Sequence, residues 1–223
     1  MSGQPLGPGP RTKVRRLPAK ASYDSRVVFS IIDEARYCHV AGVVDGLAMA
    51  LPTLHAREGS TLYLHGSRSN AIMRAILDAG RASVSVTLYD GLRLARSGFE
   101  SSIAYRSVVI IGSTTEVRDE EEKARILNRF VDAVLPGRAS EVRALSDQEA
   151  RLTLIVALRI DEASAKISQG PTEDEAEDRE LPIWSGTVPA RLRFGEPVPS
   201  DDGAMAGGNV ELPASVRRLL EQQ

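Results

Sequence analysis

The sequence predicts a mainly β fold with flanking helices: a small closed or split β-barrel of about six or seven mostly antiparallel strands. Two observations carry this prediction. Apolar and polar residues alternate in several separated runs, which is typical of half-buried strands. The Asp-Gly pairs at 45–46 and 90–91 are strong turn signals between such runs. Short turns favour antiparallel neighbours, because parallel strands need long crossover connections.

The first half of the chain predicts a helix, a meander of strands and a second helix. Asp24 or Ser25 can cap the first helix, and Asp45-Gly46 closes a tight hairpin. Gly80 follows the second helix in the position that helix ends favour. Asp90-Gly91 is expected to turn the chain out of the next strand. In chain order, the expected elements are a helix at 23–37, strands at 37–44, 47–56 and 60–66, a helix at 70–79 and a strand at 82–89.

The second half predicts a long strand, two helices and another long strand. Acidic residues at 119–122 suit the positive end of a helix, and Ser146 with Glu149 has the pattern of a capping box. The expected elements are an irregular stretch at 92–104, a strand at 105–118, a helix at 119–135, a short helix after Ser146 and a strand at 152–168. The expected divisions are a mobile basic arm at 1–20, a barrel domain at 21–194 with an acidic loop at 170–180, and a C-terminal extension at 195–223 with a terminal turn of helix.

Composition excludes several kinds of site. Cys38 is the single cysteine, which excludes an internal disulfide and a two-cysteine metal site within one chain. None of His39, His55 and His65 stands four residues from another, so we expect no helical metal pair. The formal net charge of −2 gives no general affinity for nucleic acid. No apolar run approaches the roughly 20 residues of a membrane helix, and no signal peptide is visible, so we expect a soluble cytoplasmic protein without a membrane partner.

The stretch TLYLHGSRSNAIMRAI at 61–76 joins an alternating run to a helical pattern. Backbone N–H groups at a helix N-terminus attract anions. Ser67 and Ser69 add hydroxyl donors, Arg68 adds a fork that matches phosphate oxygens, and Arg74 lies about a turn and a half into the helix. The alternative is that Ser69 only caps the helix and both arginines are solvated. The stretch is neither a Walker loop nor a Gly-x-Gly-x-x-Gly fingerprint.

A second basic cluster, Tyr105-Arg106-Ser107, opens the strand that follows ARSGFESSIA. Strand alternation places Tyr105 and Ser107 on one face and Arg106 on the other. Two such clusters in one small barrel indicate an anionic ligand with a flat part, and the alternative is a solvated strand end. Cys38 lies in an apolar run, where we expect a buried and unreactive thiol.

Four separated stretches resemble, in the same order, the flavin-nucleotide-binding branch of the pyridoxamine 5′-phosphate oxidase-like superfamily, the FMN-binding split barrels. Nitroimidazole reductase-like proteins look like close relatives. The stretches are CHVAGVVDGLAMALPTLHAREGSTLYLHGSRSNAIMRAI, VSVTLYDGLRLARSGFESSIAYRSVVIIG, EASAKI and LPIWSGTVP, within residues 23–190. The resemblance implies an FMN-binding split barrel and a homodimer with the flavin at the subunit interface. No histidine follows His65, so the Arg-x-His substrate motif of true pyridoxamine phosphate oxidases is absent, and that activity is not expected.

Carried over position by position, the resemblance assigns cofactor-binding roles. The segment along the isoalloxazine ring is Leu51, Pro52, Thr53 and Leu54. The phosphate seat is His65, Gly66, Ser67, Arg68, Ser69 and Arg74. The group near the ribityl chain or phosphate is Tyr105, Arg106 and Ser107. Lys166 either reaches the flavin phosphate or closes a strand pair. Trp184 either covers the flavin or substrate from the partner subunit or packs in the core.

The resemblance therefore implies an FMN-dependent oxidoreductase that acts on a small organic molecule, with NADH or NADPH as the candidate electron donor. The flavin itself carries the hydride or electrons, and no separate catalytic residue is identified. The alternatives are a flavin-binding carrier or sensor without turnover, and the same barrel holding haem or a deazaflavin.

Overall fold

The computed structural model of the chain describes residues 5–200 and 211–221. The strands are β1 (Ala21–Ser22), β2 (Cys38–Val44), β3 (Leu47–Thr53), β4 (His55–Glu58), β5 (Thr61–Ser67), β6 (Arg81–Leu94), β7 (Ser102–Glu116), β8 (Thr153–Ser168) and β9 (Gly186–Pro189). The α-helices are α1 (Ser25–Glu34), α2 (Ala71–Asp78), α3 (Glu120–Val134), α4 (Asp147–Leu152) and α5 (Ala214–Glu221). Three short 3₁₀ helices are η1 (Pro18–Lys20), η2 (Arg138–Glu141) and η3 (Ala176–Glu180).

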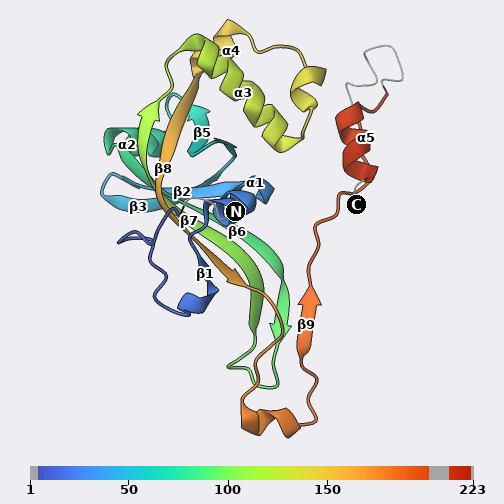
Figure 1. Ribbon diagram of the computed structural model, residues 1–223. Helices are drawn as coiled ribbons and strands as arrows, with labels where there is room; N and C mark the ends of the chain where they lie inside the picture. The colour runs from blue at the N-terminus through green and yellow to red at the C-terminus, as the bar shows by residue number, and fades with distance from the viewer. Residues whose placement is uncertain (1–4, 201–210, 222–223) are drawn as a thin grey trace.

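All nine strands belong to one antiparallel sheet. The main path runs β3-β2-β6-β7-β8-β5-β4, with β1 paired to β8 and β9 paired to β6. Figure 1 shows α3 and α4 at one end of the sheet and the long β6–β7 ribbon leaving the other end, with β9 beside it. The path has two free ends, so the predicted split-barrel class is confirmed, with more strands and helices than predicted.

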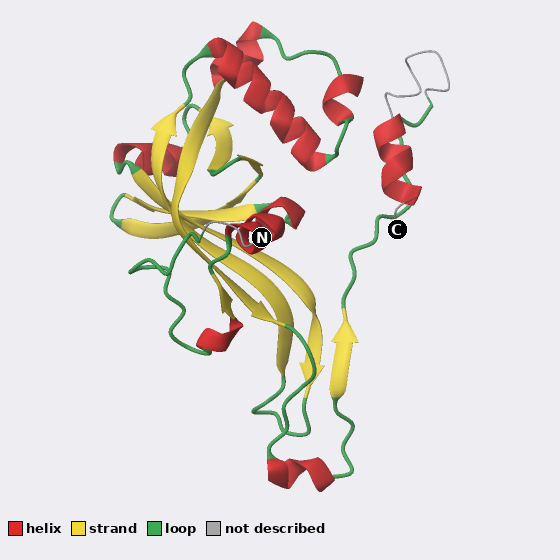
Figure 2. Cartoon of the chain, in the orientation of Figure 1, coloured by secondary structure: helices red, strands yellow, loops and turns green. Residues whose placement is uncertain are grey.

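Figure 2 shows the helices lying around the strands of the sheet. The barrel interior is filled by apolar side chains, and buried positions alternate along strands such as β6. Val84 and Ile110 are fully buried inside the sheet, and α2 closes one end with Met73 and Ile76. Full burial of each such side chain contributes about 1.5–3 kcal/mol. Cys38 is fully buried, as expected, and burial raises the pKa of its thiol to about 12, which disfavours the reactive thiolate.

The helices begin where their caps predict. The Asp24 side chain accepts from the Arg26 N–H, and Ser146 forms the predicted capping box with Glu149. The cap of α2 is Asn70, whose side chain accepts from the Met73 N–H, so Ser69 does not cap this helix. α2 thus starts one residue later than predicted, and Gly80 follows it with φ +65° as expected.

Two turn signals had different outcomes. Asp45 and Gly46 both have positive φ, 50° and 79°, and close the predicted β2–β3 hairpin. Asp90-Gly91 does not turn the chain: β6 continues to Leu94 through a bulge between Tyr89 and Gly91. The predicted irregular stretch at 92–104 was therefore wrong at its two ends, where β6 takes up 92–94 and β7 takes up 102–104, and confirmed at 95–101. Gly91 has φ +142° and lies so close to the Val188 backbone that a side chain would collide with it.

The predicted meander at 37–66 was wrong in one respect. The run 47–56 is two strands, because Leu54 breaks it into β3, which pairs with β2, and β4, which pairs with β5. β5 then pairs with β8 rather than with β3. The break opens the sheet into the two halves of a split barrel.

The predicted N-terminal arm packs on the barrel over its described part, 5–20. The Leu6 N–H donates to Tyr23 O at 2.9 Å, and Ala163 N donates to Leu6 O at 3.0 Å. Thr12 is 3% exposed and donates to Glu162. Residues 1–4 of the arm lie outside the described part. Within residues 5–200 and 211–221, no helix is both long enough and apolar enough to cross a bilayer.

The chain from β9 onward folds back on the domain, and its described residues, 186–200 and 211–221, are called the extension below, whereas the sequence placed the start of a C-terminal extension at 195. β9 pairs with β6, and the predicted terminal helix is confirmed as α5. The Ser215 N–H and hydroxyl both donate to Glu141 in η2, which ties α5 to the segment after α3. The acidic loop at 170–180 contains η3.

Candidate functional site

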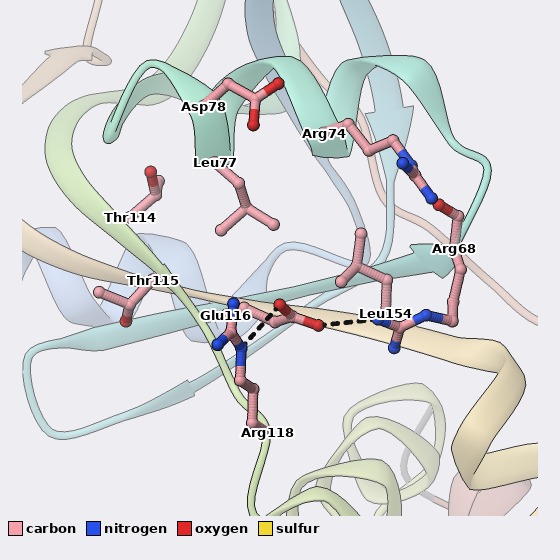
Figure 3. A pocket seen from close by; sticks show the side chains of 9 residues that line it. All are labelled: Arg68, Arg74, Leu77, Asp78, Thr114, Thr115, Glu116, Arg118 and Leu154. Atoms are coloured by element: carbon pink, nitrogen blue, oxygen red, sulfur yellow. Dashed lines mark hydrogen bonds and ion pairs between the residues drawn. The ribbon is translucent and has the colours of Figure 1, made fainter.

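A pocket of about 570 Å³ lies beside α2, at the end of β7 (Figure 3). Arg68 Nη2 donates to Glu116 at 3.2 Å, and Arg118 Nε donates to the other Glu116 oxygen at 3.0 Å. Arg74 reaches from α2 to the Arg68 backbone carbonyl. We call this cavity the seat pocket. Its lining residues are Arg68, Arg74, Leu77, Asp78, Thr114, Thr115, Glu116, Arg118 and Leu154.

The charges of the seat pocket leave it weakly positive. Burial alone would raise the pKa of Glu116, but hydrogen bonds from Arg118 and Arg68 outweigh burial and hold it below its ordinary value. Glu116 therefore stays ionised. Three guanidinium groups face two carboxylates, which leaves one positive charge in excess. The pocket can accept an anion, and Glu116 is the group that the anion must displace or share.

The strand-to-helix turn carries further donors, although Arg68 is the one residue of the turn among those that line the seat pocket. Asn70 N donates to Ser67 O at 3.0 Å, and Ser67 Oγ lies 3.1 Å from Ser69 Oγ. The first helical hydrogen bond is Arg74 N to Asn70 O, and Asn70 itself caps Met73. The first two N–H groups of α2 precede these bonds, which is the arrangement that helix-terminal anion sites use.

His65 lies on the opposite face of β5 from Gly66, which packs against Asn70 of the turn. The ring of His65 is 4.3 Å from that of Phe130 in α3, and its Nδ1 is buried without a partner among the described residues. Burial lowers the pKa of His65, so the ring is neutral near pH 7. The structure therefore separates His65 from the seat pocket, although the two are close in sequence.

The segment from Leu51 to Leu54 lies near the turn that joins β5 to α2. Thr53 ends β3, and Leu54 directly precedes His55, whose partner in β5 is Leu64. Leu54 is 39% exposed, and Pro52 is also exposed. The segment is thus accessible and lies close to the end of β5 that leads into the seat.

The second basic cluster is divided by the sheet. Arg106 donates to both Glu34 oxygens, at 2.5 and 2.7 Å, and to both Asp90 oxygens, at 3.0 and 2.8 Å. Hydrogen bonds to Asp90 and then to Glu34 raise the pKa of Arg106 above its ordinary value. Arg106 is therefore an internal ion-pair residue that joins α1, β6 and β7.

Tyr105 and Ser107 face away from Arg106, and Lys166 stands directly opposite Ser107 in the β7–β8 ladder. Lys166 also faces Ala21 of β1, so its backbone closes a strand pair. Ser107 is nine residues from Glu116 along β7, about 30 Å at the rise of a strand. Within one chain, the two predicted clusters are not brought together.

Trp184 is 65% exposed and precedes β9, at the far end of the β6–β7 ribbon. It is placed neither in the core nor in the seat pocket. The sequence reasoning missed Glu116 and Arg118, which no local motif marks. They reach the seat because the β7–β8 and β5–β8 pairings bring the end of β7 next to Ser67.

A second cavity, about 370 Å³, lies between α1, β4 and the end of α3. His55 lines it and is 6% exposed, and its Nε2 is 2.8 Å from Ile32 O. A carbonyl only accepts, so Nε2 carries the proton and Nδ1 keeps its lone pair, without a partner among the described residues. Desolvation lowers the pKa of His55, against opposing effects of the Ile32 carbonyl and Asp33.

A third cavity, about 860 Å³, lies between the end of α1, the middle of β6 and residues 190–194 of the extension. We call it the arm pocket. Its walls carry Tyr37, Tyr89 and Phe194, and its floor holds the Arg106 ion pairs. No sequence motif indicated it, because its sides come from three segments, 34–37, 87–90 and 190–194, that are far apart in the chain.

Comparisons with known proteins agree with this fold. The family model described as pyridoxamine 5′-phosphate oxidase matches residues 24–167. No curated protein matches the sequence. The structure of the flavocytochrome Anf3 from Azotobacter vinelandii is 33% identical, with a TM-score of 0.89 over 96% of this chain and 98% of that chain. The FAD and heme binding protein from Mycobacterium smegmatis is 35% identical, with a TM-score of 0.83 over 90% and 97%.

A candidate 5-nitroimidazole antibiotic resistance protein from Bacteroides thetaiotaomicron shares the fold. It is 21% identical, with a TM-score of 0.57 over 66% of this chain and 86% of that chain. The family match covers more than half of the chain, and the two more similar structures exceed 30% identity over almost their full lengths. The resemblance drawn from the sequence is confirmed, and this chain belongs to the pyridoxamine 5′-phosphate oxidase family of split barrels.

Proposed function

We propose that this chain binds a flavin nucleotide and acts as an oxidoreductase on a small organic molecule. The observation that carries the proposal is its likeness, over nearly the whole of each chain, to a flavocytochrome and to an FAD and heme binding protein. A bound flavin supplies the hydride or electron transfer, and the protein supplies binding and orientation.

The seat pocket fits the phosphate of such a nucleotide. Arg68, Arg74 and Arg118 line the pocket. The hydroxyls of Ser67 and Ser69 lie in the adjoining turn, outside the residues that line it. Forked guanidinium donors together with helix-terminal N–H groups form a common phosphate-binding set. We infer that the ring system extends from the seat toward Pro52 and Thr53, along the exposed edge where β3 gives way to β4.

We favour FAD over FMN, because the Mycobacterium smegmatis protein is described as binding FAD. FMN, which the sequence resemblance implied, is the alternative. Chromatography of the cofactor released from purified protein separates the two. If the protein releases only FMN, FMN takes the place of FAD in this proposal. If it holds no flavin as purified, and none after incubation with FAD and FMN, the proposal itself is overturned.

We also propose a homodimer, since the β2–β3 hairpin exposes apolar side chains that a second copy would cover. Val43 is 62% exposed, Leu47 68% and Met49 47%. The expected result is a dimer by light scattering, which Leu47→Glu with Val43→Glu converts to monomer. A wild-type monomer at micromolar concentration would exclude this arrangement.

A haem is the second candidate cofactor, because both similar structures are described as haem or cytochrome proteins. His55 fits a ligand position: one ring nitrogen donates to a backbone carbonyl, as metal-binding histidines usually do, and the other is free among the described residues. Arg129 lines the adjoining cavity and is a cation suited to an acidic group on a ligand, whereas Arg57 beside it is already paired with Asp33. The His55→Ala variant should lose a Soret band that the His39→Ala control keeps.

The activity test is steady oxidation of NADPH or NADH by flavin-loaded protein, with quinones, nitro compounds and aldehydes as acceptors. Turnover that depends on the bound flavin supports an oxidoreductase. Bound flavin with no turnover for any acceptor or donor would instead favour the carrier or sensor alternative.

A further inference from the structure

We propose that the arm pocket binds an adenine nucleotide diphosphate: the adenosine end of a nicotinamide dinucleotide donor, or the same half of FAD. This inference rests on the proposed flavin function, since it assigns a place to a nucleotide that such a protein would use. The seat pocket and the arm pocket lie at opposite ends of β7, so the arm pocket is a separate site within the chain.

The walls of the arm pocket are suited to a flat ring. Tyr37 is 55% exposed, Tyr89 54% and Phe194 40%, so the rings are accessible rather than packed in the core. Arg36 places its guanidinium 5.8 Å from the centre of the Phe194 ring. Aromatic faces and guanidinium planes are the surfaces on which nucleotide bases stack. A volume of about 860 Å³ is within the range of sites for ligands of this size.

The charges of the arm pocket are suited to a diphosphate. Arg106 is already neutralised by Glu34 and Asp90, which together outweigh its single charge. Arg36, Arg191 and Arg193 also line the pocket, so its cations exceed its carboxylates by two. Arg191 and Arg193 have no hydrogen-bond or ion-pair partner among the described residues. Exposed arginines that converge on one cavity without a counter-charge provide the forks that phosphate oxygens accept.

The outer wall of the arm pocket is segment 190–194, which strand pairing and a backbone hydrogen bond hold in place. β9 pairs with β6 from Gly91 to Leu94, and Ala190 N donates to Asp90 O at 2.9 Å. The bulge at Gly91 gives β9 room to approach, since a side chain there would collide with Val188. Segment 190–194 continues directly from this ladder. The family match ends at residue 167, so the extension adds this wall to the part of the chain shared with the family.

The two pockets also differ in the kind of ligand they suit. The side chains that line the seat pocket include no aromatic ring, so it provides cations and hydroxyl groups for a phosphate but no surface for stacking. The arm pocket provides three rings and a larger positive excess. A base with its attached diphosphate therefore suits the arm pocket, whereas an isolated phosphate group suits the seat.

The test is calorimetric titration of the FMN-loaded protein, in which no adenosine group of the flavin can occupy the arm pocket, with ADP, NADPH and NADH. We expect ADP to bind, and Arg191→Gln with Arg193→Gln to weaken ADP at least about 10-fold. Phe194→Ala should weaken ADP by a similar factor through lost stacking. The matched control is Arg15→Gln with Arg16→Gln, which removes the same charge from two exposed arginines of the N-terminal segment and should leave ADP affinity unchanged.

The arms of the experiment separate the two sources of the nucleotide. Weaker NADPH or NADH binding with unchanged flavin content assigns the pocket to the donor, whereas loss of FAD with retention of FMN assigns it to the adenosine half of FAD. No ADP binding by wild-type protein that holds FMN would overturn this inference and leave the proposed function standing. Equal losses in the control and pocket variants, or binding of haemin alone, would overturn it as well.

Discussion

The seat pocket and the arm pocket are both basic cavities that include residues of β7, yet they are built differently. The seat lies at a strand-to-helix turn, with its motif contiguous in the sequence and Glu116 already holding two of its arginines. The arm pocket joins the end of α1, the middle of β6 and the C-terminal extension. Its unpaired arginines lie on the extension and not on the strand. The comparison teaches that a basic cluster in the sequence does not show whether its charges are already paired, because the fold supplies the partners.

The largest expected effect is at the seat. Arg68→Ala with Arg74→Ala should weaken flavin binding at least about 100-fold, since each lost charge-assisted hydrogen bond costs about 1.5–3 kcal/mol. Flavin fluorescence titration measures the affinity, and a thermal melt checks that the fold persists. Arg191→Gln with Arg193→Gln should leave FMN affinity unchanged. Equal affinities in wild type and the seat variant would place the phosphate elsewhere.

Arg106 tests whether a basic residue with paired charges contributes to stability rather than to ligand binding. Arg106→Met leaves Asp90 and Glu34 without their cation, and its side chain is 24% exposed. We expect a loss of about 1–2 kcal/mol, between the values for exposed and buried pairs. Each kcal/mol corresponds to a melting temperature about 2–4 °C lower for a chain of this size. An unchanged melt would mean that the ion pairs contribute nothing to stability.

Asn70 separates helix capping from anion binding at the seat. Asn70→Ala should cost about 1 kcal/mol, because the Met73 N–H loses its acceptor. Asn70→Asp keeps a capping oxygen and should keep the melting temperature, but its negative charge should weaken flavin binding. A stable Asn70→Asp variant with wild-type flavin affinity would show that the phosphate does not approach the start of α2.

Replacement of Glu116 should strengthen flavin binding rather than weaken it. Glu116→Gln frees Arg68 and Arg118 from a carboxylate that competes with phosphate. Exposed ion pairs of this kind are worth about 0.2–1 kcal/mol, so flavin should bind roughly 2- to 5-fold more tightly. Equilibrium titration at two ionic strengths measures the gain, which should shrink in salt. Weaker binding would indicate that Glu116 positions the arginines rather than competing with the ligand.

Lowering the pH should destabilise the two ends of the molecule to different extents, and this is the smallest effect that we expect. Burial lowers the pKa values of His55 and His65 below the ordinary value of about 6.5. The folded state then binds fewer protons than the unfolded state, so stability is full above about pH 6.5 and falls as the pH falls through the lowered values. Hydrogen exchange near β4, β5 and α3 should rise between pH 7 and 5. Exchange around the arm pocket, which no histidine lines, should change less.

Much of the fold followed from local patterns. Alternation predicted β2, β7 and β8, helix signals predicted α2 and α3, and Asp45-Gly46 predicted the hairpin that forms. These features depend on periodicity and on residues within one turn of each other. Asp90-Gly91 misled because a glycine with positive φ serves a bulge as well as a turn, and only pairing with β7 and β9 decides between them.

The sequence by itself determined the split-barrel class, the family and the strand-to-helix turn at 65–74, because each depends on contiguous residues or on motifs in a fixed order. The tertiary structure alone decided which charges are free. It paired Arg106 with Glu34 and Asp90, brought Glu116 and Arg118 to Arg68, and turned His65 toward Phe130. It also brought the extension against β6 to form the arm pocket. Charge compensation depends on contacts across the sheet, between residues far apart in the chain, and no local pattern encodes those contacts.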